Sequence, residues 1–328
     1  MRVLITGATG LVGSFLTRKL LEDGHTLVAT KREHSNLALV NDISDQIEWI
    51  ETDLSEAIFW DDHLNDIDAI VHTAAIVSFD KRWERKMYKT NVKGTADLVN
   101  AALKANIGIF LHISSVAAIG RIPGQLEITE RDRWEDTAFD SIYARSKYLQ
   151  ELEVWRGAEE GLKVKIINPS VVLGPGTWAD TGSTAVFKYA YDEKDYFPKG
   201  DVNYVDVRDV ASIAAKLLLS EVHNERFILN AGSLSYEHFF EKIAHAFGKE
   251  APSKAPTSWM LNIGVWVEWL RSRLTGNEAL ITKETAKLSK SRFHYQNEKV
   301  IKALDVDFRS LDESIEWTTA TLTKAYSL

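Results

Sequence analysis

Cysteine is missing from this sequence altogether. Its absence excludes disulfide bonds and thiolate nucleophiles, and it fits a reducing compartment. Long hydrophobic runs are missing as well, because no uncharged apolar stretch approaches the roughly 20 residues that a membrane-spanning helix needs. The first strand pattern begins directly after Met1, which leaves no room for a signal peptide. We therefore expect a cytoplasmic protein without a membrane span.

Positive charge is scarce too. Lys and Arg total 39 against 47 Asp and Glu, a formal net charge of −8, and no basic stripe runs along the chain. A nucleic-acid partner is therefore not expected. The nine histidines show no spacing typical of metal ligands, so no metal site is expected either.

The chain does contain enough apolar material for a large core, since 45% of its 328 residues are hydrophobic. In the first half, short apolar runs alternate with amphipathic stretches. The predicted strands are 3–5, 27–30, 47–51, 69–72, 110–113 and 164–167. The predicted helices between them are 11–23, 55–64, 81–106 and 141–160. Buried Val/Ile/Leu strands separated by helices are typical of the α/β class, here a Rossmann-like, doubly wound parallel sheet.

The pattern changes after about residue 168, where proline and glycine mark a loop-rich stretch. Later helical patterns lie at 208–219, 235–247, 257–274 and 310–326, with strand-like pieces near 202–206 and 226–229. We expect a Rossmann-type, doubly wound domain over 1–167 and a smaller, mainly helical lobe over 168–328. Segments near 201–230 are expected to return to the first domain. In such folds the ligand lies across the carboxyl ends of the strands.

Three evenly spaced glycines follow the first predicted strand. Glycine lets the backbone turn with positive φ and approach a pyrophosphate closely, and the N–H groups of the next helix can bind the anion. The spacing G-x-x-G-x-x-G differs from the usual dinucleotide fingerprint, so a glycine-rich turn without a ligand is an alternative. The candidate cofactor-binding residues here are Gly7, Thr9, Gly10, Leu11, Val12 and Gly13.

The end of the second predicted strand bears on the choice of dinucleotide. An acidic residue about 20 residues after the glycine loop usually holds the ribose of NAD. This chain instead has Lys31 and Arg32, followed by Glu33. A guanidinium can bind a phosphate through two hydrogen bonds, so the pair predicts NADP rather than NAD. The alternatives are a solvated charged loop, or Glu33 on a ribose hydroxyl.

A Y-x-x-x-K motif, Tyr143 to Lys147, lies on the predicted helix 141–160. Its i, i+4 spacing places phenol and ammonium on one face, where the cation would lower the tyrosine pKa from about 10. Alone, such a motif often occurs as a surface pair. The preceding strand, however, ends at Ser115, so a serine, a tyrosine and a lysine are expected to meet. The alternative for Ser115 is a turn or capping residue.

With these motifs the chain resembles the extended short-chain dehydrogenase/reductase family, also called the NAD-dependent epimerase/dehydratase superfamily. The matching motifs occur in family order from residue 3 to about 230. They are T-G-x-x-G-x-x-G at 6–13, Asp53-Leu54, H-T-A-A at 72–75, T-N-V-x-G-T at 90–95, Ser114-Ser115, Y-x-x-x-K at 143–147, P-S-V-V-L-G-P at 169–175 and Y-V-D-V-R-D-V-A at 204–211.

The resemblance implies a role for each matching residue. Ser115 would orient the substrate oxygen, Tyr143 would be the acid/base, and Lys147 would bind the nicotinamide ribose. Asn91 would be structural. The implied cofactor contacts are Asp53 and Leu54 at the adenine, Thr73, Ala74 and Ala75 along the cofactor, and Pro169 and Val172 beside the nicotinamide. The helices 81–106 and 141–160 resemble the pair that forms a dimer interface in many relatives, so a homodimer is an expectation.

Two positions indicate the branch of the family. Members that act on nucleotide sugars commonly have asparagine two residues after Pro169 and arginine just before it, where this chain has Val171 and Asn168. An apolar side chain cannot bind a pyrophosphate, so the resemblance is nearest to the dihydroflavonol reductase and 3β-hydroxysteroid dehydrogenase branch. That branch implies NADP-dependent reduction of a ketone or aldehyde, or oxidation of a secondary alcohol, on a small, largely apolar substrate. The alternatives are an NAD-dependent nucleotide-sugar epimerase or dehydratase, and a non-catalytic dinucleotide-binding redox sensor.

One apolar, tryptophan-rich segment, 259–270, has no counterpart among these motifs. A core helix, a wall of an apolar substrate pocket and a membrane-surface contact are the three interpretations.

Overall fold

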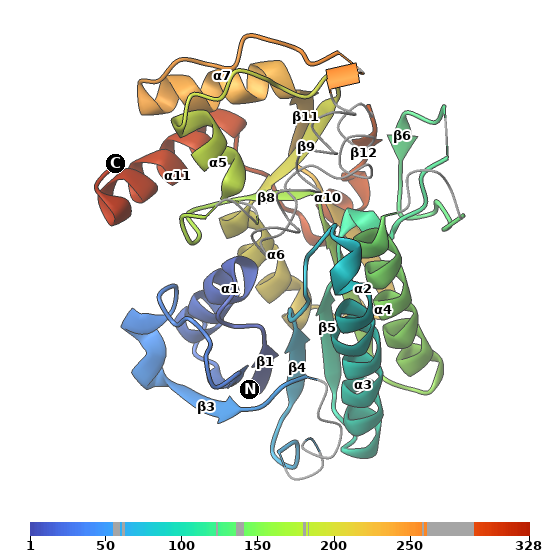
Figure 1. Ribbon diagram of the computed structural model, residues 1–328. Helices are drawn as coiled ribbons and strands as arrows, with labels where there is room; N and C mark the ends of the chain where they lie inside the picture. Colours follow the sequence, from blue (N-terminus) through green and yellow to red (C-terminus); the bar gives the residue numbers. More distant parts are fainter. Residues whose placement is uncertain are drawn as a thin grey trace.

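The computed structural model describes residues 1–328 apart from 55–59, 61–62, 123, 136–140, 180–181, 183, 258 and 261–291. Its centre is a seven-stranded parallel sheet with the strand order β10-β7-β5-β4-β1-β2-β3 (Figure 1). The strands are β1 (Arg2–Thr6), β2 (Thr26–Lys31), β3 (Ile47–Glu51), β4 (Ala69–His72), β5 (Ile109–Ile113), β7 (Val164–Pro169) and β10 (Glu225–Leu229).

Helices cover both faces of this sheet, which explains why its strands are apolar throughout. Side chains alternate across a strand, so Val3 and Ile5 pack against one helical layer while Leu4 packs against the other. The first layer holds α1 (Leu11–Glu22), α6 (Val207–Leu219) and α10 (Glu298–Leu304). The second holds α3 (Gly94–Lys104) and α4 (Ile142–Glu159).

A second lobe lies beyond the carboxyl ends of the strands (Figure 1). It contains a three-stranded sheet of β8 (Val171–Leu173), β9 (Asp201–Asp206) and β11 (Gly232–Ser235). Among the described residues, its helices α5 (Ala185–Tyr191), α7 (Tyr236–Phe247) and α11 (Leu311–Tyr326) share one apolar core. Beside it, β6 (Glu127–Ile128) pairs with β12 (His294–Tyr295).

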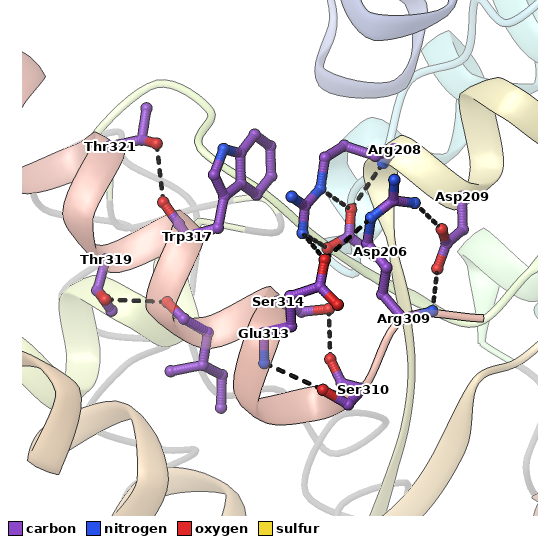
Figure 2. Close-up of polar contacts among 11 residues, drawn as sticks. Asp206, Arg208, Asp209, Arg309, Ser310, Glu313, Ser314, Trp317, Thr319 and Thr321 are labelled. Carbon is purple, nitrogen blue, oxygen red and sulfur yellow. Dashed lines mark hydrogen bonds and ion pairs between the residues drawn. The ribbon is translucent and has the colours of Figure 1, made fainter.

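An ionic cluster attaches the last helix of this lobe to the first domain (Figure 2). Asp206 caps the N-terminus of α6 and forms an ion pair with Arg208 at 2.7 Å. The Arg208 guanidinium lies 3.9 Å from the centre of the Trp317 ring on α11. Asp209 forms a second ion pair with Arg309, directly before α11. Because Asp206 and Asp209 are buried, these contacts fix the position of α11 against α6.

The predicted fold class is confirmed, including the mainly helical C-terminal portion. The six strands predicted in the first half and most helices lie within a residue or two of their predicted bounds. The stretch 81–106 is not one regular helix. It consists of a 3₁₀ turn (Lys81–Trp83), α2 (Glu84–Met87), a π-helical turn (Tyr88–Lys93) and α3. The short elements β8, β11, α5 and α10 were not predicted, and most of 55–64 and 257–274 lies outside the described residues.

Candidate functional site

The glycine loop joins β1 to α1, and its three glycines are required for different reasons. Gly7 has φ +76°, and a Cβ there would lie 2.7 Å from the Ala74 nitrogen. A Cβ on Gly13 would collide with the Gly7 carbonyl. At Gly10, in contrast, a Cβ would meet only the Gly7 oxygen, at an ordinary 3.4 Å. Gly7 and Gly13 therefore allow close packing, whereas Gly10 is exposed and borders open space.

This open space is suited to an anion. Gly10 is the N-cap of α1 and has no side chain to occupy the free N–H groups of the first turn. The N–H groups of Leu11, Val12 and Gly13 belong to that turn, where the helix dipole is positive. Thr9 completes the loop beside them. The residues present thus fit the pyrophosphate of a dinucleotide.

The segment after β4 packs directly against the glycine loop. The Thr73 hydroxyl donates a hydrogen bond to the Thr6 carbonyl at 2.6 Å, and Ala74 and Ala75 follow it along the carboxyl edge. Asn91, in the π-helical turn, accepts a hydrogen bond from the Ile76 N–H and donates one to the Ile76 carbonyl. Asn91 is fully buried, so it fixes the backbone of this segment. This geometry agrees with the structural role that the resemblance implies.

Lys31 ends β2, and Arg32 lies exposed in the turn that follows. The Arg32 N–H donates to the Ser35 hydroxyl at 2.9 Å, which closes the turn. Asp53 and Leu54 follow β3, and Leu54 is buried against α3, where a Cβ on Gly94 would touch it. All four residues lie at the same edge of the sheet as the glycine loop.

Ser115, Tyr143 and Lys147 come together at the carboxyl end of β5. Ser141 caps α4 by accepting a hydrogen bond from the Ala144 N–H, which places Tyr143 in the first turn and Lys147 in the next. The Lys147 ammonium donates to the carbonyl of Ile113, the last residue of β5, at 3.1 Å. The Tyr143 hydroxyl forms a hydrogen bond with the Ser115 side chain. Ser115 also accepts a hydrogen bond from the Ala117 N–H, so it caps a turn as well.

Burial dominates the electrostatics of the pair. Lys147 is only 2% exposed, and burial lowers its pKa to about 7, while the nearby Glu151 raises it. The pKa of Tyr143 is raised by burial, and the Ser115 hydrogen bond and the charge of Arg121 act in the opposite direction. The motif spacing predicts that Lys147 lowers the tyrosine pKa below its ordinary value. This prediction is wrong, because burial outweighs the neighbouring charges and raises the pKa.

A buried carboxylate supports the loop that carries Ser115. Glu151 accepts hydrogen bonds from the Ser114 hydroxyl at 2.7 Å and from the Asn168 amide at 2.8 Å. The same Asn168 amide donates to the Ser115 carbonyl. Arg226 forms an ion pair with Glu151 at 3.1 Å, which compensates its buried charge. Two hydrogen bonds therefore fix Ser115: its carbonyl accepts from the Asn168 amide, and its hydroxyl accepts from the Ala117 N–H.

The two residues predicted to lie beside the nicotinamide, Pro169 and Val172, belong to β7 and β8. Pro169 ends β7 at the carboxyl edge and is buried. Val172, on β8, is 8% exposed and belongs to the core that also contains Val205 and Val207. Val171 beside it is 37% exposed, so the apolar side chain at this position faces outward.

Sequence reasoning missed several residues of this site. Arg121 acts on Tyr143 by its charge and donates a hydrogen bond to the Tyr295 hydroxyl, 174 positions away. Gln150 accepts a hydrogen bond from Lys147 at 2.7 Å. The only signal for Gln150 and Glu151 was their spacing of three and four residues from Lys147 on one helix.

Among the described residues, no group of three or more His, Cys, Asp or Glu side chains is arranged to hold a metal ion. No helix in the described part of the chain is both long and apolar enough to cross a membrane.

Comparison with known proteins adds the family. The model of the NAD dependent epimerase/dehydratase family matches residues 3–232. A Synechocystis sp. protein that carries a provisional dihydroflavonol 4-reductase name is 26% identical over 318 residues, 95% of this chain and 91% of that protein. Cinnamoyl-CoA reductase 1 of Petunia hybrida is 30% identical over 233 residues, 67% of this chain and 68% of that enzyme. The solved structure of gox2253 has a TM-score of 0.82 at 29% identity and covers 99% of this chain and 98% of its own.

Proposed function

Because the chain belongs to the NAD dependent epimerase/dehydratase family, we propose that it is an NADP-dependent reductase of ketones or aldehydes on small, largely apolar molecules. In the reverse direction it would oxidise the corresponding secondary alcohol. The chain is an NAD(P)-dependent oxidoreductase of the extended short-chain type, and a nicotinamide dinucleotide is its cofactor. The choice of NADP, the class of substrate and the roles of individual residues are our proposals.

The observation that carries this proposal is the meeting of Ser115, Tyr143 and Lys147 beside the glycine loop. Ser115 follows β5, and the other two residues lie on α4, yet all three side chains meet at one carboxyl edge. Tyr143 forms a hydrogen bond with Ser115, and Lys147 donates to the Ile113 carbonyl at the end of β5. A binding protein without catalysis would not need a tyrosine that is linked to a serine here. A redox sensor is therefore the weaker alternative.

Each residue then has a defined task. The nicotinamide supplies or accepts the hydride when it is bound. Tyr143 donates a proton to the carbonyl oxygen of the substrate, and Ser115 stabilises that oxygen by a hydrogen bond. Lys147 provides positive charge near the phenol and an N–H group for the cofactor ribose. Positioned proton transfer of this kind contributes roughly 10²–10⁴-fold to a rate.

The exposed turn after β2 supports NADP. Arg32 lies in that turn, and no carboxylate ion-pairs with it or with Lys31 in the described part of the chain. Two cations at the end of β2 favour a phosphate on the adenosine ribose over a bare hydroxyl. The Glu33 carboxylate oxygen lies 3.7 Å from the His34 ring nitrogen Nε2, so this carboxylate faces His34 rather than Arg32.

Val171 supports an apolar substrate over a nucleotide sugar. Its side chain faces outward from β8, where enzymes on nucleotide sugars commonly have asparagine. The names of the two relatives described above are those of reductases, which agrees with this choice. The segment 259–270, for which a pocket wall is one of three interpretations, lies almost entirely outside the described residues.

A reaction assay tests the proposal. Purified protein, NADPH and a panel of aromatic aldehydes and ketones should give substrate-dependent loss of the nicotinamide absorbance. Tyr143→Phe should bind NADPH as the wild type does but react about 10²-fold more slowly, because the developing alkoxide loses its proton donor. Native mass spectrometry of the purified protein adds a second reading. Tightly bound NAD, together with full activity of Tyr143→Phe, would contradict the reductase assignment.

We also propose a cytoplasmic location and a homodimer through α3 and α4, both from the sequence. One feature opposes the dimer. Five cationic side chains line the groove beside α2 and α4. In a two-fold symmetric dimer they would face the same five cations of the second subunit and repel them. They are Arg85, Lys86, Lys89, Lys93 and Arg145. Light scattering at low and high salt would decide, because salt screens such repulsion.

A further inference from the structure

A buried polar network lies between the glycine loop and Lys147. It consists of side chains from β1, β4, α3 and α4, none of them exposed by more than 2%. The members are Thr6, His72, Thr95, Lys147 and Gln150. A buried polar group costs free energy unless it has a hydrogen-bond partner, and the members of this network supply partners to one another.

Gln150 is the link between Lys147 and the rest. The Lys147 ammonium can only donate hydrogen bonds, so the group that faces it at 2.7 Å must be the Gln150 amide oxygen. The Gln150 NH₂ group then points the other way, toward the Thr95 hydroxyl at 2.9 Å and the His72 ring at 3.1 Å. The amide orientation is therefore set by the Lys147 ammonium, which can only donate.

The far side of the network reaches the glycine loop. His72 contacts the Thr95 hydroxyl at 2.8 Å through one ring nitrogen and the Thr6 hydroxyl at 2.7 Å through the other. Thr6 is the last residue of β1, directly before Gly7. His72 is neutral, because burial lowers its pKa to about 3.

We propose that Gln150 is a positioning residue, which favours the charged form of the Lys147 ammonium and ties it to the strand end that carries the glycine loop. The relevance of this to catalysis rests on the proposed function, in which Lys147 serves the cofactor and Tyr143. Gln150 itself touches neither substrate nor cofactor in this assignment. Its amide oxygen contacts Lys147, while its NH₂ group contacts His72, Thr95 and, at 3.4 Å, the Ala74 carbonyl.

The charges around Lys147 leave room for such a role. Glu151 on α4 is the nearby acid, and its oxygens are already engaged by Ser114, Asn168, Trp155 and Arg226. On β4 and β5, His72 and His112 both have lowered pKa values and are neutral. Tyr143 on α4 is also neutral at physiological pH, because its pKa is raised. The Ile113 carbonyl and the Gln150 oxygen are the two acceptors that contact the ammonium among the described residues. An acceptor favours the charged form, so its removal should lower the lysine pKa.

Two variants with opposite expected effects test the proposal. Gln150→Met has about the same length and lacks the acceptor, so the Lys147 pKa should fall by about one unit or more. Gln150→Glu places a carboxylate against the ammonium, so the pKa should rise. The His72 ring can change tautomer, donate to the second carboxylate oxygen and accept from the Thr6 hydroxyl instead. The Thr95 hydroxyl keeps its hydrogen bond to the Asn91 carbonyl.

The measurement is a pH titration of ¹³C-labelled lysine side chains by NMR, with Lys147 assigned by the signal that Lys147→Met removes. Lys165 serves as the control within the same spectrum. It is equally buried, its pKa is lowered to about 8, and its ammonium donates to carbonyls at the end of α6, away from Gln150. Only the Lys147 titration should move.

An unchanged Lys147 pKa in Gln150→Met would overturn the proposal, because a residue that merely fills space is replaced well by methionine. If Gln150→Met fails to fold, an unchanged pKa in Gln150→Glu has the same meaning. The alkaline limb of the pH–rate profile should move with the lysine, downward in the Met variant and upward in the Glu variant. Shifted lysine titrations without reduction of any carbonyl compound would leave the positioning role intact and refute the proposed function instead.

Discussion

The two ends of the parallel sheet each contain a buried lysine, and the two lysines differ in what surrounds them. At the carboxyl end, Lys147 contacts one strand-end carbonyl and one side-chain amide, next to Tyr143. At the amino end, Lys165 on β7 donates to the carbonyls of Leu217, Leu218 and Ser220, at 2.7, 2.9 and 2.6 Å. Both are 2% exposed, and burial lowers both pKa values.

Burial and a lowered pKa therefore do not identify a functional lysine by themselves. Lys165 has three backbone acceptors at a helix C-terminus, where a cation is stabilised by the helix dipole. All three N–H groups of its ammonium donate to backbone carbonyls. Lys147 has two acceptors among the described residues, so one of its three N–H groups is available for a ligand. We therefore expect changes at the carboxyl end to affect binding and rate, and changes at the amino end to affect stability.

The largest effect should come from the glycine loop. Gly10→Val should abolish dinucleotide binding and leave the fold intact, because the new side chain enters the open space that the pyrophosphate needs. Fluorescence titration with NADPH measures the binding, and circular dichroism with thermal melting measures the fold. Gly13→Val is the matched control, since a Cβ there collides with the Gly7 carbonyl and should cost stability as well. Normal NADPH affinity in Gly10→Val would show that the loop is only a turn.

The two lysines allow a direct exchange experiment. Lys147→Met should weaken NADPH binding and slow reduction, and it should lose less unfolding free energy than Lys165→Met, because two acceptors rather than three lose their donor. Lys165→Met should bind NADPH normally and lose about 1–3 kcal/mol of unfolding free energy, because three carbonyls lose their donor. Chemical denaturation gives the unfolding free energy of each variant, and NADPH titration gives its dissociation constant. The comparison fails if Lys165→Met loses affinity while its stability is unchanged.

The sequence predicts most of the sheet, because a strand that is buried on both faces is a run of apolar residues, as in Leu4 and its neighbours. It also predicts Tyr143 and Lys147, since one helical turn separates them. The network around Gln150 could not be predicted, because residues 6, 72, 95 and 150 are brought together only by the packing of four elements. Lys165 gave no signal either, since its acceptors are backbone groups about 50 residues away.

The short strands of the second lobe were missed for another reason. The segment of β8 contains three residues between a proline and a glycine, which is too short for any periodicity to be read. Its pairing with β9 depends on Tyr204, Val205 and Asp206 at the right register. The pKa of Tyr143 illustrates a similar limit. Motif spacing shows that a cation is near, but the degree of burial, which decides the direction of the shift, comes from the whole fold.

The smallest effect should come from the exposed end of the cofactor site. Arg32→Ala should reduce the preference for NADPH over NADH by about tenfold, since a charge-assisted hydrogen bond contributes roughly 1.5–3 kcal/mol and this one would be screened by solvent. The backbone of the turn should survive, because its closing hydrogen bonds join the Arg32 main chain to Ser35. Lys31→Ala is the control for position, and Glu33→Ala is the control for charge. Removing Glu33 should sharpen the preference for NADPH, because a nearby carboxylate opposes a phosphate. Equal affinity of the wild type for NADPH and NADH would remove the basis for NADP, and a loss of NADH binding in Glu33→Ala would favour NAD instead.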